Sequence, residues 1–161
     1  MASITGNGSK GHHKFTLTVS EASYSIPDNT SSVSFSFQIL PINTSWNWEL
    51  WGDKISYSIT INGTNYTGTI PAYDGYSTVT LKSGSLTVAH SADGTKSISY
   101  SFSVTDNTGQ NYTSGNASAS GTLALTTIPR ATTPTLCATS VSMGSSVTIT
   151  MTPASNSFKH K

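Results

Sequence analysis

Hydrophobic and polar residues alternate with a period of two along most of the chain. In the stretches 33–39, 55–61 and 98–104, every second residue is a valine, isoleucine, phenylalanine or tyrosine. The residues between them are almost all serine or threonine. Successive side chains of a β-strand point to opposite faces of a sheet, so each stretch predicts a strand with one buried and one solvent-facing side.

Turn-forming residues divide the rest of the chain into strands of similar length. The segments 27–30, 62–64, 92–95 and 106–110 have the Asn, Asp, Gly and Pro content of tight turns. No stretch has the period of 3.6 residues that is typical of an amphipathic helix. We therefore predict an all-β protein, an antiparallel β-sandwich of immunoglobulin-like or jelly-roll type, with the strand order left open. The expected strands are 12–24, 32–40, 54–62, 65–70, 77–82, 84–90, 96–105 and 117–127.

Composition along the chain predicts four parts. Residues 1–11 are rich in Gly, Ser and Asn and are expected to form a flexible or docking arm before a sandwich domain at 12–128. Pro129 and Pro134 predict an extended linker at 129–134. Residues 135–161 alternate again but are too few to enclose a core. We expect them to begin a second immunoglobulin-like β-module that continues past Lys161, or to pair with another subunit.

Charge and cysteine content exclude several classes of function. The 161 residues carry a net charge of +1, only 9% are charged, and there is one cysteine, which excludes an intrachain disulfide. The absence of a Lys/Arg run argues against nucleic-acid binding, and no apolar stretch is long enough for a membrane span. The hydroxyl-rich surface is typical of an extracellular protein or a virion, yet the N-terminus lacks the apolar core of a signal peptide. We expect a virion protein made in the host cytoplasm, or else a piece of a secreted protein.

Reactive groups are sparse. The seven acids lie mostly in turns and form no pair that would support hydrolysis, and no nucleophile or phosphate-loop motif is present. We therefore expect no enzyme activity and no cofactor. The segment 106–111 offers oxygen donors but lacks the acidic spacing of a calcium loop, and the adjacent His12 and His13 would diverge on a strand, so no metal site is predicted.

Aromatic residues outside the regular strands are the best candidates for ligand binding. The stretch 43–52 holds Trp46, Trp48 and Trp51, whose indole rings would stack on sugar rings. The alternative is that one or two of them belong to the core, as in many sandwiches. A second candidate group is Tyr73, Asp74 and Tyr76, in a loop at 71–76, where the alternative is a tyrosine packed under a turn that Asp74 stabilises. A weaker third group, which also lies in a loop, is Asn111 and Tyr112.

Several longer motifs resemble a known family. They are Gly6-Asn7-Gly8-Ser9-Lys10-Gly11-His12-His13, Ile70-Pro71-Ala72-Tyr73-Asp74-Gly75-Tyr76-Ser77, the segments 84–90 and 93–95, and Ala117-Ser118-Ala119-Ser120-Gly121-Thr122 leading into 126–131. Together, across roughly 1–134, they resemble the N-terminal region of an uncharacterised family of siphophage minor structural (tail) proteins. Those proteins occur in phages and prophages of streptococci and related Gram-positive bacteria. The resemblance implies a virion tail component and carries over no binding residues.

Three hypotheses for function follow. The first is a phage tail structural protein whose sandwich contributes to host cell-surface glycan recognition, with other tail proteins and host cell-wall polysaccharide as partners. The second is a purely structural tail assembly or spacer module. The third is a carbohydrate-binding module of a longer cell-wall hydrolase. The sequence leaves the ligand and homo-oligomer formation open.

Overall fold

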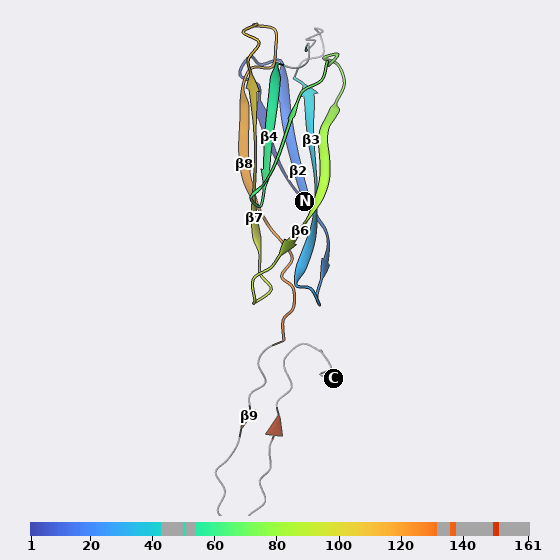
Figure 1. The fold of residues 1–161 in the computed structure, drawn as a ribbon, viewed down its shortest axis with the longest axis vertical. Coiled ribbons are helices and arrows are strands. Elements are labelled where there is room, and N and C mark those ends of the chain that lie inside the picture. Colours follow the sequence, from blue (N-terminus) through green and yellow to red (C-terminus); the bar gives the residue numbers. More distant parts are fainter. Residues whose placement is uncertain (43–49, 51–53, 132–135, 138–149, 152–161) are drawn as a thin grey trace, which may run out of the picture.

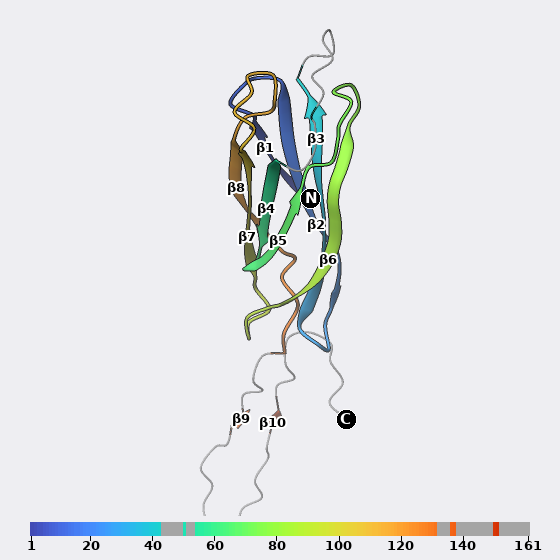
Figure 2. The ribbon, with the colours of Figure 1, turned by 45° about the horizontal axis from the view of Figure 1, so that its top comes forward.

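The computed structural model describes residues 1–42, 50, 54–131, 136–137 and 150–151. Within these residues eight strands form two four-stranded antiparallel sheets, and no helix is present. Figures 1 and 2 show the two sheets face to face. The first has the order β1 (Ala2–Asn7), β2 (His13–Ser25), β3 (Thr30–Pro41), β6 (Val79–Ala89). The second has the order β5 (Thr64–Thr69), β4 (Ile55–Ile61), β7 (Ser97–Asp106), β8 (Ala117–Ala124).

The all-β prediction is confirmed. The alternating stretches form strands because each buries one row of side chains between the sheets and leaves a hydroxyl row outside. The centre of the core is an aromatic cluster. The ring of Phe37 lies 6.0 Å from that of Phe15, 5.4 Å from Tyr57 and 5.0 Å from Phe102, which joins both sheets in one packed layer.

The arm expected at 1–11 is instead a strand over most of its length. β1 pairs with β2 from Ala2 opposite Val19 to Asn7 opposite Lys14. The glycine content reflects close approach rather than flexibility: a Cβ atom at Gly6 would lie 2.9 Å from the carbonyl oxygen of Ser118 on β8. Residues 2–7 are therefore part of the sandwich and not a flexible arm, whereas docking by residues 1–11 stays a prediction.

The break expected at Ser83-Gly84 is also wrong. Residues 79–89 form the single strand β6, which pairs with β3 along its whole length. Gly84 lies opposite Phe35, whose ring would be 3.1 Å from a Cβ at this position. The glycine therefore makes room for an aromatic ring and does not turn the chain.

A short hairpin and two antiparallel residue pairs complete the described secondary structure. Asn62 and Gly63 have φ angles of 47° and 82°, which is the left-handed conformation that a two-residue hairpin requires. Beyond the sandwich, β9 (Leu136–Cys137) pairs with β10 (Thr150–Met151) in antiparallel fashion. The rest of the second module expected at 135–161 lies outside the described residues.

The chain leaves the sandwich through residues 125–131, which we call the exit segment. The amide of Leu125 donates to the carbonyl of Lys96 at 2.9 Å, and the amide of the fully buried Ile128 donates to Gly94 at 2.9 Å. Arg130 Nη1 donates to the carbonyl of Ile26 at 3.0 Å. The expected linker at 129–134 therefore begins against the sandwich, and its residues 132–134 lie outside the described part of the chain.

A chain of polar side chains also holds the exit segment against the sandwich. Ser31 Oγ donates to Glu21 Oε1 at 2.6 Å, and Thr126 donates to Glu21 Oε2 from both its amide and its hydroxyl, at 2.8 and 2.7 Å. His90 Nε2 lies 2.7 Å from Ser31 Oγ, while Nδ1 donates to the carbonyl of Gly94 at 2.8 Å. Burial alone would raise the pKa of Glu21, but the hydrogen bonds from Ser31 and Thr126 outweigh it and lower the pKa below its ordinary value.

Candidate functional site

Three connections between strands, and the described residues 42, 50 and 54 of a fourth, lie at the end of the sandwich opposite the exit segment, which we call the loop end. These are 8–12, 42–54, 70–78 and 107–116, and Figures 1 and 2 show their described parts together. Antiparallel pairing places the connections there, because the last residue of one strand lies beside the first residue of its partner. The pairings that fix the loop end are His13–Pro41, Ser56–Thr69, Ile55–Asp106 and Val104–Ala117.

A buried joint connects two of these segments to the start of strand β2. Leu50 and Tyr73 exchange two backbone hydrogen bonds of 3.0 Å, and the Tyr73 ring meets the edge of the His13 ring at 5.4 Å. The Tyr73 hydroxyl donates to the carbonyl of Ser77 at 2.6 Å. Burial, together with the nearby charge of Asp74, raises the pKa of Tyr73 to about 12, so this phenol stays a neutral donor. Tyr73 is therefore a core residue beneath the loop, not a side chain on its surface.

Asp74 shapes the turn that follows. Its Oδ1 accepts hydrogen bonds from the amides of Tyr76 and Ser77 at 3.0 and 3.3 Å, and both carboxylate oxygens lie 3.2 Å from the Ser77 hydroxyl. The amide bonds of Tyr76 and Ser77 favour the charged carboxylate and lower the pKa of Asp74. The consequence is a fixed turn from which the Tyr76 side chain projects, 52% exposed.

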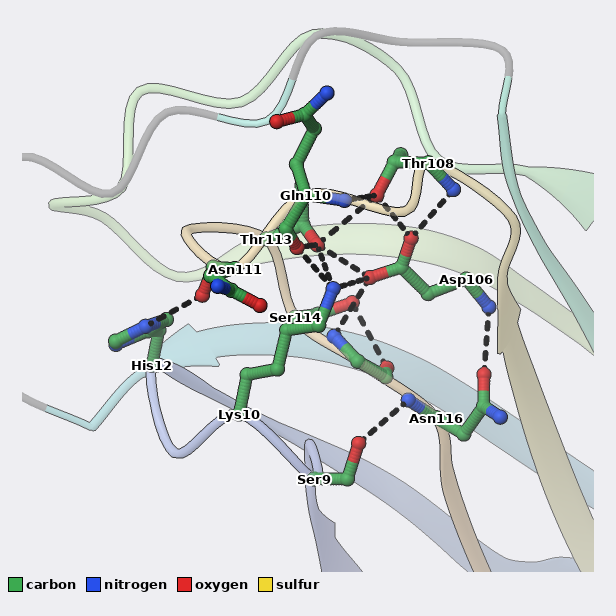
Figure 3. Close-up of polar contacts among 11 residues, drawn as sticks. Ser9, Lys10, His12, Asp106, Thr108, Gln110, Asn111, Thr113, Ser114 and Asn116 are labelled. Carbon is green, nitrogen blue, oxygen red and sulfur yellow. Dashed lines mark hydrogen bonds and ion pairs between the residues drawn. The ribbon is translucent and has the colours of Figure 1, made fainter.

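A polar network around Asp106 organises the 107–116 connection (Figure 3). The Asp106 carboxylate is 1% exposed and accepts from the amide and hydroxyl of Thr108, at 3.0 and 2.6 Å. It also accepts from the Thr113 hydroxyl at 2.5 Å and from the Gly115 amide at 2.8 Å. Burial alone would raise the pKa of Asp106, but the hydrogen bonds from Thr108, Thr113 and Gly115 hold the pKa far below the ordinary carboxyl range.

Lys10 brings a positive charge into this network from the 8–12 connection. Its Nζ lies 3.4 Å from Asp106 Oδ2 and 2.9 Å from Thr113 Oγ1, and it also donates to the carbonyl of Gln110. Figure 3 shows the ammonium group among these oxygens. The oxygen donors of the 106–111 turn, considered from sequence as a calcium loop, thus surround the ammonium group of a lysine.

Further contacts join the 8–12 connection to its neighbours. His12 Nε2 donates to the carbonyl of Asn111 at 3.2 Å, and the amide of Ile42 donates to the carbonyl of His12 at 2.9 Å. The amide of Ser9 donates to the carbonyl of Asn116 at 2.9 Å, and Ser9 Oγ accepts from the amide of Asn116 at 3.1 Å. Within this frame Tyr112 is 48% exposed, so a second aromatic side chain reaches solvent at the loop end.

The chain matches a known protein family over its whole length. The family model described as "Siphovirus protein of unknown function (DUF859)" matches residues 1–161. The chain belongs to this siphovirus family. No curated protein and no solved structure matches it significantly. The family match confirms the siphophage part of the resemblance, whereas a tail position and a streptococcal host stay predictions.

The candidate residues of this siphovirus protein fall into three groups. Trp46, Trp48 and Trp51 lie outside the described residues, in the connection between β3 and β4, whose flanking strands end and begin at the loop end. Tyr73 and Asp74 hold the 70–78 connection together. Tyr76, Asn111 and Tyr112 are on the surface of the loop end.

Sequence reasoning missed the residues that fix the siphovirus protein's loops. The sequence pattern predicts a flexible or docking arm around Lys10 and a turn at Asp106. No local signal joins them, because 96 positions separate the two residues in the chain. In the described residues, no group of three or more His, Cys, Asp or Glu side chains is arranged to hold a metal ion, and no helix could span a membrane.

Proposed function

We propose that this siphovirus protein is a structural component of the phage tail whose loop end binds glycan on the host cell surface. The observation that supports the proposal most directly is the position of its exposed aromatic side chains. Tyr76 and Tyr112 lie 36 positions apart in the chain, yet both are exposed at the loop end. Exposed aromatic rings beside amide groups such as Asn111 are the side chains that protein sites use to stack on and hydrogen-bond to sugars.

Hydrogen bonds also fix the backbone of the loop end. The Asp106 network, the Asp74 turn and the joint between Leu50 and Tyr73 fix the backbone on which the exposed rings stand. A surface that is ordered before binding loses less conformational entropy when the ligand arrives. Its position opposite the exit segment leaves the loop end free to face outward while the rest of the chain connects to the virion.

Binding of this kind requires no chemical step. Stacking and hydrogen bonds at one small site give weak affinity, and several copies on one virion raise the overall affinity through effective concentration. The test should therefore use the full chain in multivalent form, for example coupled to beads, and measure retention on purified host cell walls.

The experiment compares aromatic residues at the two ends of the sandwich. Tyr76→Ala and Tyr112→Ala remove exposed rings from the loop end, and the matched control Tyr24→Ala removes a ring that is 47% exposed near the exit segment. We expect each loop-end variant to weaken retention at least tenfold and the control to leave it unchanged. Trp46→Ala, Trp48→Ala and Trp51→Ala test the sequence-based candidates in the same assay. Failure of the folded wild type to bind walls would overturn the proposal.

A second candidate function is a rigid spacer or assembly module of the tail. The hydrogen bonds that hold the exit segment favour it, because they fix the direction in which the chain leaves the sandwich. This function predicts that the protein is retained by other tail proteins and not by cell walls. A pull-down with purified tails lacking this protein, run beside the wall assay, separates the two functions.

A further inference from the structure

The outer face of the β5-β4-β7-β8 sheet has an unusual chemistry. Its side chains are short and uncharged, and they come in register from all four strands. They are Ser56, Ser58 and Thr60 of β4, Asn65, Thr67 and Thr69 of β5, Ser97, Ser99, Ser101, Ser103 and Thr105 of β7, and Ser118, Ser120, Thr122 and Ala124 of β8. These side chains therefore offer hydrogen-bond donors and acceptors, and none of them is ionisable.

Two adjoining hollows make a shallow groove across this face. One, of about 360 Å³, lies over β5, β4 and β7, and the other, of about 450 Å³, extends over β7 and β8 to Asn7 and Ser9. Ser103 and Thr105 line both hollows, so the groove is continuous. Asn116 and Ser9 place its far end against the 107–116 and 8–12 connections, and the groove therefore runs on from the loop end.

Most of the described groove hydroxyls have no protein partner. On the same face, Ser58 and Thr60 of β4 both donate to Asn65 Oδ1 of β5, at 2.8 and 3.5 Å. Among the described residues, the hydroxyls of six groove residues make no hydrogen bond to another protein group; these are Ser56, Thr67, Thr69, Ser103, Thr105 and Ser118. Their donors and acceptors are available to a ligand.

We propose that this groove binds a chain of neutral sugars. Each hydroxyl supplies one donor and two acceptor positions, which matches the hydroxyls of a neutral polysaccharide. None of the described residues that line the groove carries an ammonium or guanidinium group, so they form no ion pair with the phosphates of a polyanionic wall polymer. The proposal rests on the proposed function and extends it: a glycan held by the loop-end aromatic residues continues along the groove, and the ligand is the uncharged part of the cell wall.

The test places a charge in the groove without touching the loop end. Ser103→Lys puts an ammonium group in the middle of the groove on the central strand β7. The matched control Ser36→Lys puts the same group on the outer face of the central strand β3 in the other sheet. Retention of bead-coupled full chain is measured on two probes, the neutral polysaccharide fraction of host cell walls and purified poly(glycerol phosphate) teichoic acid. Circular dichroism and thermal unfolding establish that both variants are folded.

The proposal expects the wild type to bind the neutral fraction and not the teichoic acid. Ser103→Lys should weaken that binding at least tenfold while Ser36→Lys leaves it unchanged. Equal retention of the Ser103→Lys variant and the wild type overturns the proposal that the groove binds glycan. If Tyr112→Ala still weakens binding in that case, glycan binding by the loop end stands without the groove. Binding of the wild type to teichoic acid alone overturns the groove in the same way. A wild type that binds neither probe overturns the groove proposal and the glycan-binding function together.

If Ser103→Lys does not fold, a second variant keeps the test decisive. Ser103→Ala with Thr105→Ala removes two hydroxyls, and undiminished binding by that variant overturns the groove proposal.

Discussion

At the scale of single residues, the ion pair between Lys10 and Asp106 shows how distant parts of the chain stabilise one loop. Lys10→Met keeps most of the apolar stem but leaves the buried carboxylate without its cation. Because four other donors remain on Asp106, we expect a loss of about 1–3 kcal/mol in the free energy of unfolding. Urea denaturation measures it. Lys82→Met, at an exposed position on β6, is the control and should cost almost nothing. An equal effect of the two substitutions would contradict this role.

Acid should weaken the fold through two carboxylates. The pKa values of Asp106 and Glu21 are lowered in the folded protein from ordinary values of 3.8 and 4.5. Below those ordinary values the unfolded chain takes up protons that the folded protein does not, so the free energy of unfolding falls as the pH drops from about 5 towards 2. Urea titrations across this range should show a shallower decline for Asp106→Asn and for Glu21→Gln. A decline parallel to that of the wild type would exclude these groups as its cause.

At the scale of strands, a glycine allows two strands of different sheets to approach closely. Gly6→Ala adds a Cβ that would lie 2.9 Å from a backbone oxygen of β8, and backbone cannot swing aside as a side chain does. We expect a loss of about 1–3 kcal/mol, typical of overpacking, in thermal or urea unfolding. Ser3→Ala, at an outward-facing position of the same strand, is the control and should be nearly neutral. A neutral Gly6→Ala would mean that β1 does not approach β8 this closely.

The alternating pattern predicts most of the strands. It fails at the two strands β1 and β6, where a glycine interrupts the pattern. The expected strand 96–105 differs from β7 by a single residue at each end, because buried and exposed side chains alternate there without a break. β1 was missed because Gly6 replaces an apolar side chain in its inward row. The expected strands 77–82 and 84–90 are the single strand β6, because Gly84 gives space to the ring of Phe35 and the pairing with β3 continues through it.

The site was only partly predictable for the same reason. Aromatic residues in loops could be chosen from sequence, and Tyr76 and Tyr112 do reach solvent. Whether a loop tyrosine lies outside or inside depends on neighbours far along the chain. Tyr73 is buried because His13 and Leu50 meet it there, and nothing in its local sequence distinguishes it from Tyr76. The partners of Asp106 are likewise set by the fold.

At the scale of the whole molecule, the two ends of the sandwich differ in structure. The exit end is closed by the hydrogen bonds of Glu21, Thr126 and Arg130 and leads to the rest of the chain. The loop end gathers four connections and the exposed aromatic side chains. Between them the outer faces carry hydroxyl groups, and one face carries the groove. The proposed function assigns attachment to one end of the sandwich and recognition to the other, which gives the molecule a direction.

Chemical labelling of tyrosines tests this direction most directly. Among the described residues the exposed tyrosines are Tyr76 and Tyr112 at the loop end and Tyr24 at the exit end. The full chain is iodinated in the presence and absence of purified host cell walls, and the modified sites are measured by mass spectrometry. We expect bound cell walls to protect Tyr76 and Tyr112 from iodination and to leave Tyr24 as reactive as before. Protection of Tyr24 alone, or of none of the three on walls that retain the protein, would contradict it.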